Sequence, residues 1–513
     1  MKIILSTLFI FFIGCNTTQN ITPKQKVIDI SPDVYGKTIT EADLKKHLYI
    51  YASNAFEGRE TGTEGQKKAV NYIRDYYKTI QVPAAQGDGK YFQNVPLHVK
   101  YVPSGSFVIG NSSYNSGSDF IPIGDKNISF EEVVYIGYGI EDQLYSDFTN
   151  INIKNKVVLV KEGEPKNDLG IYLLTNSEKP SSYTTDSMGK ITTLLDKGAK
   201  AVLLYAPSIM PRVVASYTRT RDNPSERMEL LQENTTSFTA IIGSGLANKL
   251  NPEIDINHVP QVLKVKGASA IISNSKKIAT ENVAAIIRGT KYPEEYIILS
   301  SHLDHIGLED NGVINNGADD DGSGTVALLE IAQAFKIAKD AGHGPKRSIV
   351  FLHVTGEEKG LLGSKYYTDI APIFPLNQTI ANLNIDMIGR IDPKRKGNDN
   401  YLYLIGSDRL STELHQISET ANRNSTNISL DYTYNNISDP NRYYYRSDHY
   451  NFAKNNIPVI FYFNGTHEDY HKPGDTPDKI NYNLLENRTK LVYYTAWEIA
   501  NRKERLKLDK NLN

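Results

Sequence analysis

The chain has 513 residues, of which 40% are hydrophobic and 23% are charged, and its formal net charge at pH 7 is −2. This is an ordinary globular composition, with ample apolar material for a large core. The near-neutral balance, without a long basic run, argues against nucleic acid as a partner, because phosphate binding needs concentrated lysine and arginine.

The N-terminus, MKIILSTLFIFFIGC, has a lysine followed by an apolar run of about a dozen residues, too short to span a bilayer as a mature helix. The run ends at Gly14 and Cys15, the only cysteine of the sequence. The stretch resembles a bacterial lipoprotein signal peptide, in which that cysteine is lipidated, although Phe12 stands where leucine is usual. A plain signal peptide that happens to contain a cysteine is the alternative.

We therefore expect a signal peptide over residues 1–15 with lipidation at Cys15, followed by a polar tether over residues 16–39. The expected location is the bacterial cell envelope. The protein would be held by its lipid anchor in the outer membrane, facing the periplasm or the cell surface.

Residues 40–104 are predicted to be mostly helical, because their apolar residues recur at helical spacing. Residues 105–270 change character: short β-rich runs such as VVYIGYGI and KVVLVKEGEP surround one helical stretch, which predicts a small inserted α/β domain. Residues 271–513 alternate strand, polar loop and helix, which predicts an α/β fold with a central sheet covered by helices on both faces.

Polar residues follow the expected strands of this last part. They are His302, Asp304, Asp319 with its neighbours Asp320 and Asp321, Glu357, Glu358, Asp386 and His471. In open α/β sheets the ligand site lies outside the carboxyl ends of the strands, so we expect these side chains to meet. Imidazoles and carboxylates without cysteine suit zinc first, with manganese or cobalt as alternatives.

The acidic stretch NNGADDDGSG, residues 315–324, permits two interpretations when taken alone. Aspartate and glycine are common turn residues, and an aspartate can cap the helix that follows. The same residues could instead bind a cation.

Six segments in order carry a resemblance: SSHLDHIG, NNGADDDGSGT, VTGEEKGLLGS, NIDMIGR, YRSDHYNF and DYHKPGDT. They are similar to the co-catalytic zinc aminopeptidase family, which is related to glutamate carboxypeptidase and the glutaminyl cyclases. FEGRETGTEGQKKAVNYI is similar to that family's N-terminal segment. The part from 105 to 270 resembles, more weakly, the protease-associated domain often inserted in such enzymes.

The resemblance implies a three-layer zinc-exopeptidase domain that binds two zinc ions. One ion would be held by His302 and Asp386 and the other by Glu358 and His471, while Asp319 bridges both. A cis peptide is expected between Asp319 and Asp320, with Asp321 as a turn and capping residue.

The resemblance also implies Glu357 as general base and acid in hydrolysis of peptide bonds. Asp304 would accept the other ring N–H of His302 and hold its tautomer. No role follows for Ser447, Asp448 and His449, although they match a family motif, and His305 is expected to be structural rather than a ligand.

We therefore expect a zinc-dependent aminopeptidase acting on peptides or proteins. Carboxypeptidase or glutaminyl cyclase action on the same scaffold, and a non-catalytic peptide-binding lipoprotein, are the alternatives. Side-chain preference and oligomeric state do not follow from the sequence.

Overall fold

The computed structural model describes residues 31–99, 101–124, 126–222, 227–231, 237–272, 275–395 and 397–510. The expected signal peptide and Cys15 lie outside the described residues. No helix within the described ranges is long and apolar enough to cross a bilayer.

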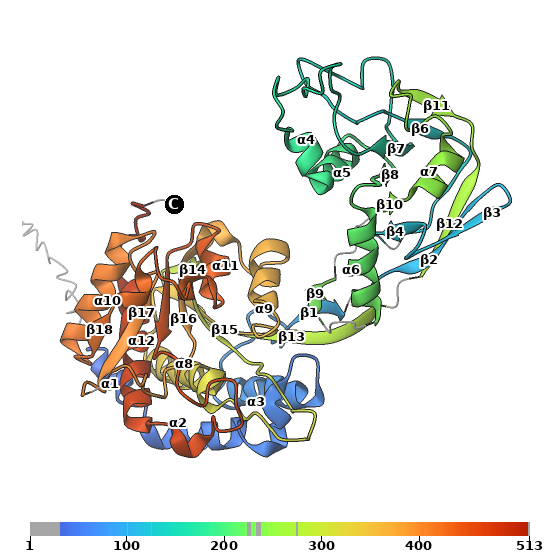
Figure 1. Ribbon diagram of the computed structural model, residues 1–513. Coiled ribbons are helices and arrows are strands. Elements are labelled where there is room, and N and C mark those ends of the chain that lie inside the picture. Colours follow the sequence, from blue (N-terminus) through green and yellow to red (C-terminus); the bar gives the residue numbers. More distant parts are fainter. Residues whose placement is uncertain are drawn as a thin grey trace, which may run out of the picture.

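A nine-stranded mixed sheet forms the centre of the larger lobe (Figure 1). In spatial order its strands are β18 (Ser429–Asp431), β17 (Tyr401–Ile405), β19 (Val459–Phe463), β16 (Thr379–Ile385), β14 (Tyr292–His302), β15 (Arg347–Val354), β13 (Lys276–Ile287), β1 (Phe92–Val99) and β9 (Met228–Leu230). The four neighbours β19, β16, β14 and β15 run parallel to one another. Their carboxyl ends therefore open onto the same edge of the sheet.

Helices cover both faces of this sheet because its strands are apolar on both sides. In β14, Ile297 and Leu299 pack into one core and Ile298 into the other. The first core lies under α1 (Asp33–Gly36), α2 (Glu41–Tyr51), α3 (Glu64–Thr79), α8 (Gly324–Asp340), α10 (Thr412–Asn424) and α12 (Tyr482–Asn501). The second lies under η3 (Tyr366–Ile370) and α11 (His449–Ala453), with α9 (Leu362–Lys365) beside them. The predicted α/β fold, with a mixed sheet between helical layers, is confirmed.

The chain between β1 and β13 forms two further sheets with hydrophobic cores of their own. The six-stranded sheet has the order β11 (Gln261–Leu263), β6 (Val133–Tyr135), β7 (Val157–Lys161), β8 (Ala201–Tyr205), β10 (Phe238–Ile242) and β4 (Phe120–Pro122). The four-stranded sheet has the order β3 (Ser112–Asn115), β2 (Ser104–Ile109), β12 (Gly267–Ile272) and β5 (Ser129–Phe130). Helices α4 (Ser182–Thr185), α5 (Ser187–Asp196), α6 (Met210–Asp222) and α7 (Ser244–Leu250) complete this part.

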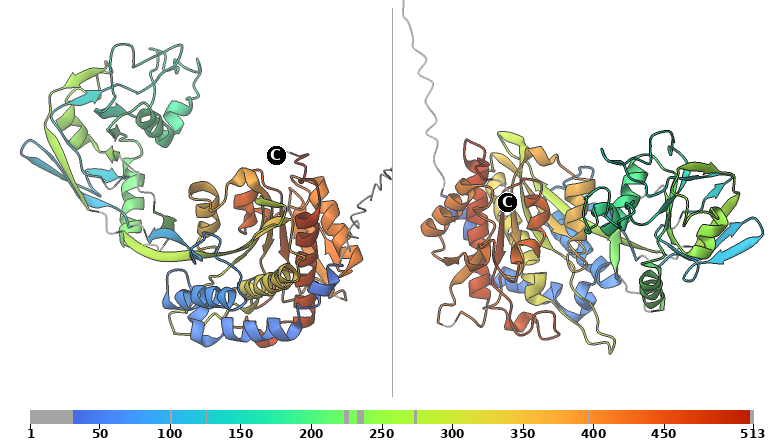
Figure 2. Two further views of the ribbon diagram at one scale, coloured as in Figure 1. Left: turned by 180° about the vertical axis from the view of Figure 1, so that it is seen from behind. Right: turned by 45° about the horizontal axis from the view of Figure 1, so that its top comes forward.

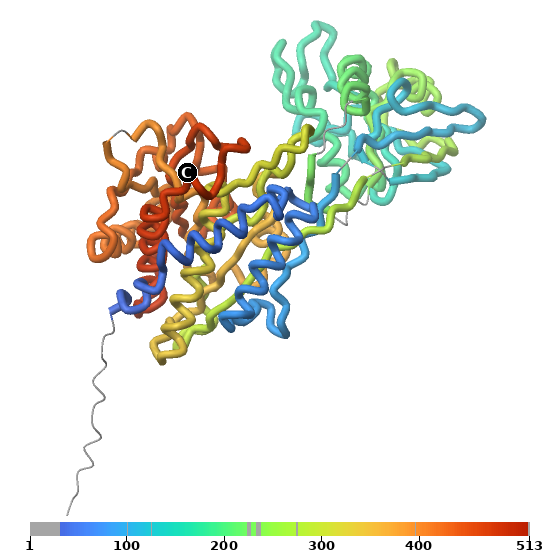
Figure 3. The backbone as a smooth tube through the Cα atoms, turned by 90° about the horizontal axis from the view of Figure 1, so that it is seen from below, coloured from blue at the N-terminus to red at the C-terminus, as the bar shows by residue number. Residues whose placement is uncertain are grey.

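These two sheets stand apart from the nine-stranded sheet as a second lobe, reached through the long strands β1 and β13 (Figures 1 and 2). The view from below shows the same separation, with β13 leading from one lobe into the other (Figure 3). We call this part the inserted lobe. Its identification as a protease-associated domain stays a prediction.

Candidate metal centre

The candidate residues lie where the parallel strands of the nine-stranded sheet end. His302 is the last residue of β14, and Asp386 directly follows β16. Glu358 lies in the turn after β15, and His471 comes from the loop after β19. Asp320 belongs to η2 (Ala318–Ser323), the turn before α8. The topology thus brings together side chains that are far apart in the sequence, as expected at this edge of an α/β sheet.

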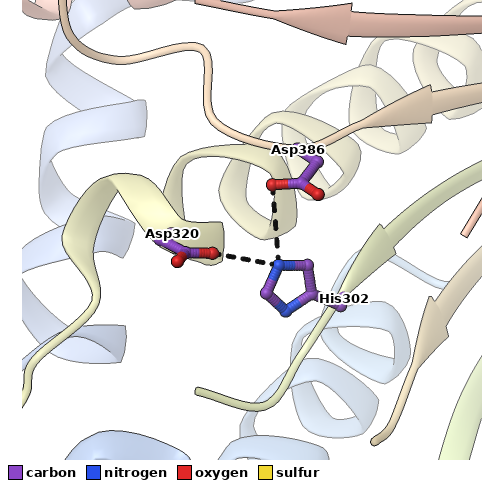
Figure 4. A group of neighbouring side chains, drawn as sticks. All are labelled: His302, Asp320 and Asp386. Atoms are coloured by element: carbon purple, nitrogen blue, oxygen red, sulfur yellow. Dashed lines mark ion pairs between the residues drawn. The ribbon is translucent and has the colours of Figure 1, made fainter. Parts of the chain in front are cut away.

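The first ligand group consists of His302, Asp320 and Asp386, all buried (Figure 4). The Nε2 atom of His302 lies 3.1 Å from Oδ1 of Asp320 and 3.6 Å from Oδ1 of Asp386. Nδ1 of His302 lies 3.0 Å from the main-chain oxygen of Asp304, which can only accept. Nδ1 therefore carries a hydrogen, and Nε2 is the ring atom that faces the two carboxylates.

The second ligand group consists of His305, Asp320 and Glu358. Nδ1 of His305 lies 3.1 Å from Oε1 of Glu358. His471 joins this group, since its Nε2 lies 3.1 Å from both Oδ2 of Asp320 and Oε2 of Glu358. The ring of Tyr470 stacks on that of His471 with 3.9 Å between centroids, which fixes the imidazole plane.

Asp320 is the residue shared by both groups, with Oδ1 toward the first and Oδ2 toward the second. The expectation that Asp319 bridges two ions is therefore wrong by one residue. The carboxylate of Asp319 accepts a hydrogen bond from the amide of Gly389 at 2.6 Å and lies 3.3 Å from Nε2 of His467. The cis peptide lies between Asp320 and Asp321 and not between Asp319 and Asp320.

Two other carboxylates hold the acidic turn in this register. Asp475 accepts hydrogen bonds from the backbone amides of Asp319, at 3.0 and 3.1 Å, and of Asp320, at 3.1 Å. Asp321 caps α8 through the amide of Gly324, as predicted, and also accepts the amide of His302 at 3.2 Å. The turn is thus attached to β14 and to the loop after β19. Burial, together with nearby Asp319, raises the pKa of Asp475 to about 6.

Glu357 stands next to the ligand Glu358 but belongs to neither group. Burial raises the pKa of Glu357 well above its usual range, and His302 opposes this shift. Asp304 does not accept the ring N–H of His302 through its side chain as expected, because its carboxylate is 3.9 Å away and its main-chain oxygen takes that hydrogen bond. The carboxylate instead accepts the amide of Glu357 at 3.2 Å and the hydroxyl of Thr61 at 2.7 Å. Asp304 therefore positions both His302 and Glu357.

Sequence reasoning missed two buried residues of the site. His305 was expected to be structural, yet it lies in the second ligand group. Asp448 accepts a short hydrogen bond from Ser364 through Oδ1, while its buried Oδ2 has no partner in the described part of the chain. Burial raises the pKa of Asp448 to about 7, and nearby His302 opposes this. The HLDH spacing, with one histidine at the end of a strand and the other three residues later, was the available signal for His305.

The two neighbours of Asp448 have structural roles. The hydroxyl of Ser447 accepts a hydrogen bond from the side-chain Nδ2 of Asn384, next to the end of β16, at 2.9 Å. His449 stacks on Phe461 of β19 with 4.7 Å between ring centroids, and burial lowers its pKa to about 3, so it packs as a neutral ring.

The donor set fits a pair of metal cations. Burial opposes the ionisation of Asp320, but His302, His471 and His305 outweigh it and hold its pKa well below the usual range. Nε2 of His302 and Oδ2 of Asp320 are buried without a hydrogen-bond partner among the described residues. Unpartnered buried polar atoms are costly, and cations between them would satisfy these. Nitrogen and oxygen donors in this mixture suit zinc.

Comparison with known proteins points to the same part of the chain. Residues 282–496 match the model of Peptidase family M28, and this segment contains every residue of both ligand groups. A probable leucine aminopeptidase of Arthroderma otae is 29% identical over 247 residues, which cover 46% of this chain and 62% of that protein. A probable glutamate carboxypeptidase of Arabidopsis thaliana is 34% identical over 106 residues, which cover 21% of this chain and 14% of that protein.

The chain thus spans less than two thirds of the length of these two relatives. A solved structure of a zinc aminopeptidase from Bacillus subtilis aligns with 92% of this chain and 98% of that chain, with a TM-score of 0.47 and 18% identity.

Proposed function

We propose that this chain, whose residues 282–496 match Peptidase family M28, is a zinc-dependent exopeptidase that releases N-terminal amino acids from peptides. One observation carries the proposal: Asp320 presents one carboxylate oxygen to each of two ligand groups, which suits two zinc ions side by side. His302, Asp320 and Asp386 would hold one ion. Asp320, Glu358 and His471 would hold the other. His305 would support this ion through the contact of its Nδ1 atom with Oε1 of Glu358.

When bound, a pair of zinc ions polarises the scissile carbonyl and lowers the pKa of the attacking water. The remaining chemistry belongs to the protein. Glu357 takes a proton from the attacking water and returns it to the leaving amine. The hydrogen bond from the Glu357 amide to Asp304 holds this glutamate where β15 ends, next to both ligand groups. Asp304 fixes His302 through its main-chain oxygen, so that Nε2 of His302 faces Asp320 and Asp386.

Two adjacent glutamates offer a matched test of these roles. Glu357→Gln keeps the shape but cannot take the proton, so turnover should fall about 10²- to 10⁴-fold with zinc content unchanged. Glu358→Gln removes a ligand oxygen that faces His305 and His471, so zinc content should fall, and added zinc should restore part of the rate. Zinc per chain and hydrolysis of an amino-acid 4-nitroanilide measure both effects. Loss of zinc in Glu357→Gln with retention in Glu358→Gln would reverse the assignment.

Carboxypeptidase action is the second candidate, because a probable glutamate carboxypeptidase is among the relatives. Digestion of a mixed peptide library, with product ends read by mass spectrometry, separates the two activities. Loss of residues from the N-terminus supports the aminopeptidase. Loss from the C-terminus would overturn it in favour of the carboxypeptidase.

We also propose that the protein acts in the bacterial cell envelope, anchored through a lipid on Cys15. The sequence around this cysteine supports the proposal: a short apolar run after Lys2 ends in Gly14 and the sole cysteine of the chain.

A further inference from the structure

The inserted lobe contains a cavity of about 510 Å³ that is separate from the metal centre. It lies where the parallel strands of the six-stranded sheet end. Lys161 is the last residue of β7, Tyr205 is the last residue of β8, and Tyr138 lies three residues beyond β6. This is the edge at which open α/β sheets bind ligands, and the volume is that of a small-molecule site.

One cation in the cavity has no counter-ion. Nζ of Lys161 lies 3.1 Å from the main-chain oxygen of Ile254 and 3.3 Å from Nδ1 of His258. No carboxylate oxygen of the described residues lies within 4.0 Å of Nζ of Lys161, the distance that defines an ion pair. Both of its hydrogen-bond partners are uncharged acceptors, so the positive charge of Lys161 remains available to an anionic group of a ligand.

Three acids in the same cavity are likewise engaged only by neutral donors. Glu162 accepts the amide and hydroxyl of Ser208 at 2.8 and 2.6 Å, and Asp255 accepts the hydroxyl of Tyr205 at 2.9 Å. The third acid is Glu164, which is 4% exposed. Its Oε2 is buried without a hydrogen-bond partner in the described part of the chain. Unpaired charges of both signs thus face one cavity.

Aromatic rings line part of the cavity. The rings of Tyr138 and His258 pack with 5.0 Å between centroids at one side. Tyr172 and Tyr205 add two further aromatic rings to the lining.

We propose that this cavity binds a short zwitterionic peptide, with its carboxylate at Lys161 and its ammonium group at the acids Glu162, Glu164 and Asp255 that line the same cavity. The choice of a peptide rather than another zwitterion rests on the proposed function. The existence of the site does not rest on the proposed function, because no residue of the metal centre lines the cavity. The inserted lobe would then hold a peptide end away from the catalytic zincs.

Hydrogen–deuterium exchange on the full-length chain tests the site by position. Glu357→Gln is the background, so that the probe, trialanine, is not consumed. Trialanine at millimolar concentration should slow exchange in the segments 161–166, 205–208 and 254–258. Lys161→Met should weaken this protection by about 10- to 100-fold, the weight of a charged hydrogen bond. Lys156→Met is the matched control, because Lys156 lies at the other end of β7 and pairs with Glu132.

Modified probes read the two charges separately. N-acetyl-trialanine lacks the ammonium group and trialanine amide lacks the carboxylate, so each should bind about 10-fold more weakly or worse. If Lys161→Met fails to fold, Asp255→Asn, on an exposed loop, tests the acidic residues instead, because it should weaken protection by trialanine. Absent protection, equal binding of the modified probes, or protection unchanged by both substitutions would overturn the proposal. Hydrolysis by the wild-type chain is scored separately, so failure of this site is distinct from failure of the proposed function.

Discussion

Replacing Asp320 and Asp319 in turn by asparagine tests which aspartate is shared by the two ligand groups. Oδ1 of Asp320 lies 3.1 Å from Nε2 of His302, and Oδ2 lies 3.1 Å from Nε2 of His471. Asp320→Asn replaces one of these oxygens by an NH₂ group, which cannot ligate a cation, and removes the negative charge from both groups. The first group would keep His302 and Asp386 as ligands. The second would keep Glu358, His305 and His471.

The number of ligands that remain sets the expected loss of zinc affinity. Changing a residue that only supports a ligand typically costs 10- to 100-fold in metal affinity, so loss of the shared ligand should cost about 100-fold or more for the first ion. Zinc content in Asp320→Asn should fall from about two ions per chain to about one or fewer, with hydrolysis lost in parallel. Asp319→Asn should keep its zinc. It perturbs only the contacts with the Gly389 amide and His467, at a cost of about 1–3 kcal/mol in stability.

Zinc per chain after dialysis, thermal unfolding and 4-nitroanilide hydrolysis should be measured on both variants in parallel. The unfolding midpoint separates a lost ligand from a lost fold. The reasoning is refuted if Asp319→Asn releases zinc while Asp320→Asn retains two ions and full turnover.

Three further predictions concern the turn, the metal and the anchor. Asp475→Ala leaves the buried amides of Asp319 and Asp320 without their acceptor, so zinc affinity measured against a competing chelator should fall about 10- to 100-fold; an unchanged affinity would contradict this positioning role. Prolonged chelation should abolish hydrolysis and added zinc should restore it, whereas full activity in protein free of transition metals would exclude the two-zinc proposal. Cys15→Ala should abolish fatty-acid labelling and release the protein from the membrane fraction, and membrane partition that does not depend on Cys15 would count against a lipid anchor.

The strand-end positions of the site could be predicted because an α/β sheet gathers the residues that follow its parallel strands. His302 and Asp386 were found in this way, as was Glu358, and all three lie in the ligand groups. The sequence correctly predicted that Asp304 supports His302, but it predicted contact through the carboxylate, whereas the main-chain oxygen makes the contact. The choice between its carboxylate and its main-chain oxygen depends on the turn after β14, which hydrophobic periodicity does not describe.

His305 was misjudged for a related reason. His305 lies three residues beyond the end of β14, where strand periodicity no longer assigns a direction to its side chain. In the structure its amide donates to the main-chain oxygen of Arg59, and a β-bridge pairs it with Glu60, so a segment from the N-terminal part of the chain turns its ring toward Glu358. The HLDH spacing marks His305 as a candidate, but the contact with Arg59 and Glu60 that orients its ring has no local signature in the sequence.

The acidic turn shows why residue type alone could not settle the register. Asp319, Asp320 and Asp321 are chemically identical, and each has a different function: Asp319 accepts the amide of Gly389, Asp320 faces both ligand groups, and Asp321 caps α8 and holds the amide of His302. The assignment depends on where Asp475, more than 150 residues later in the chain, accepts the turn's amides. A shift by one residue would point a different carboxylate at the histidines. Backbone amides that donate to Asp319 and Asp321, and histidines around Asp320, offset the repulsion among the three acids.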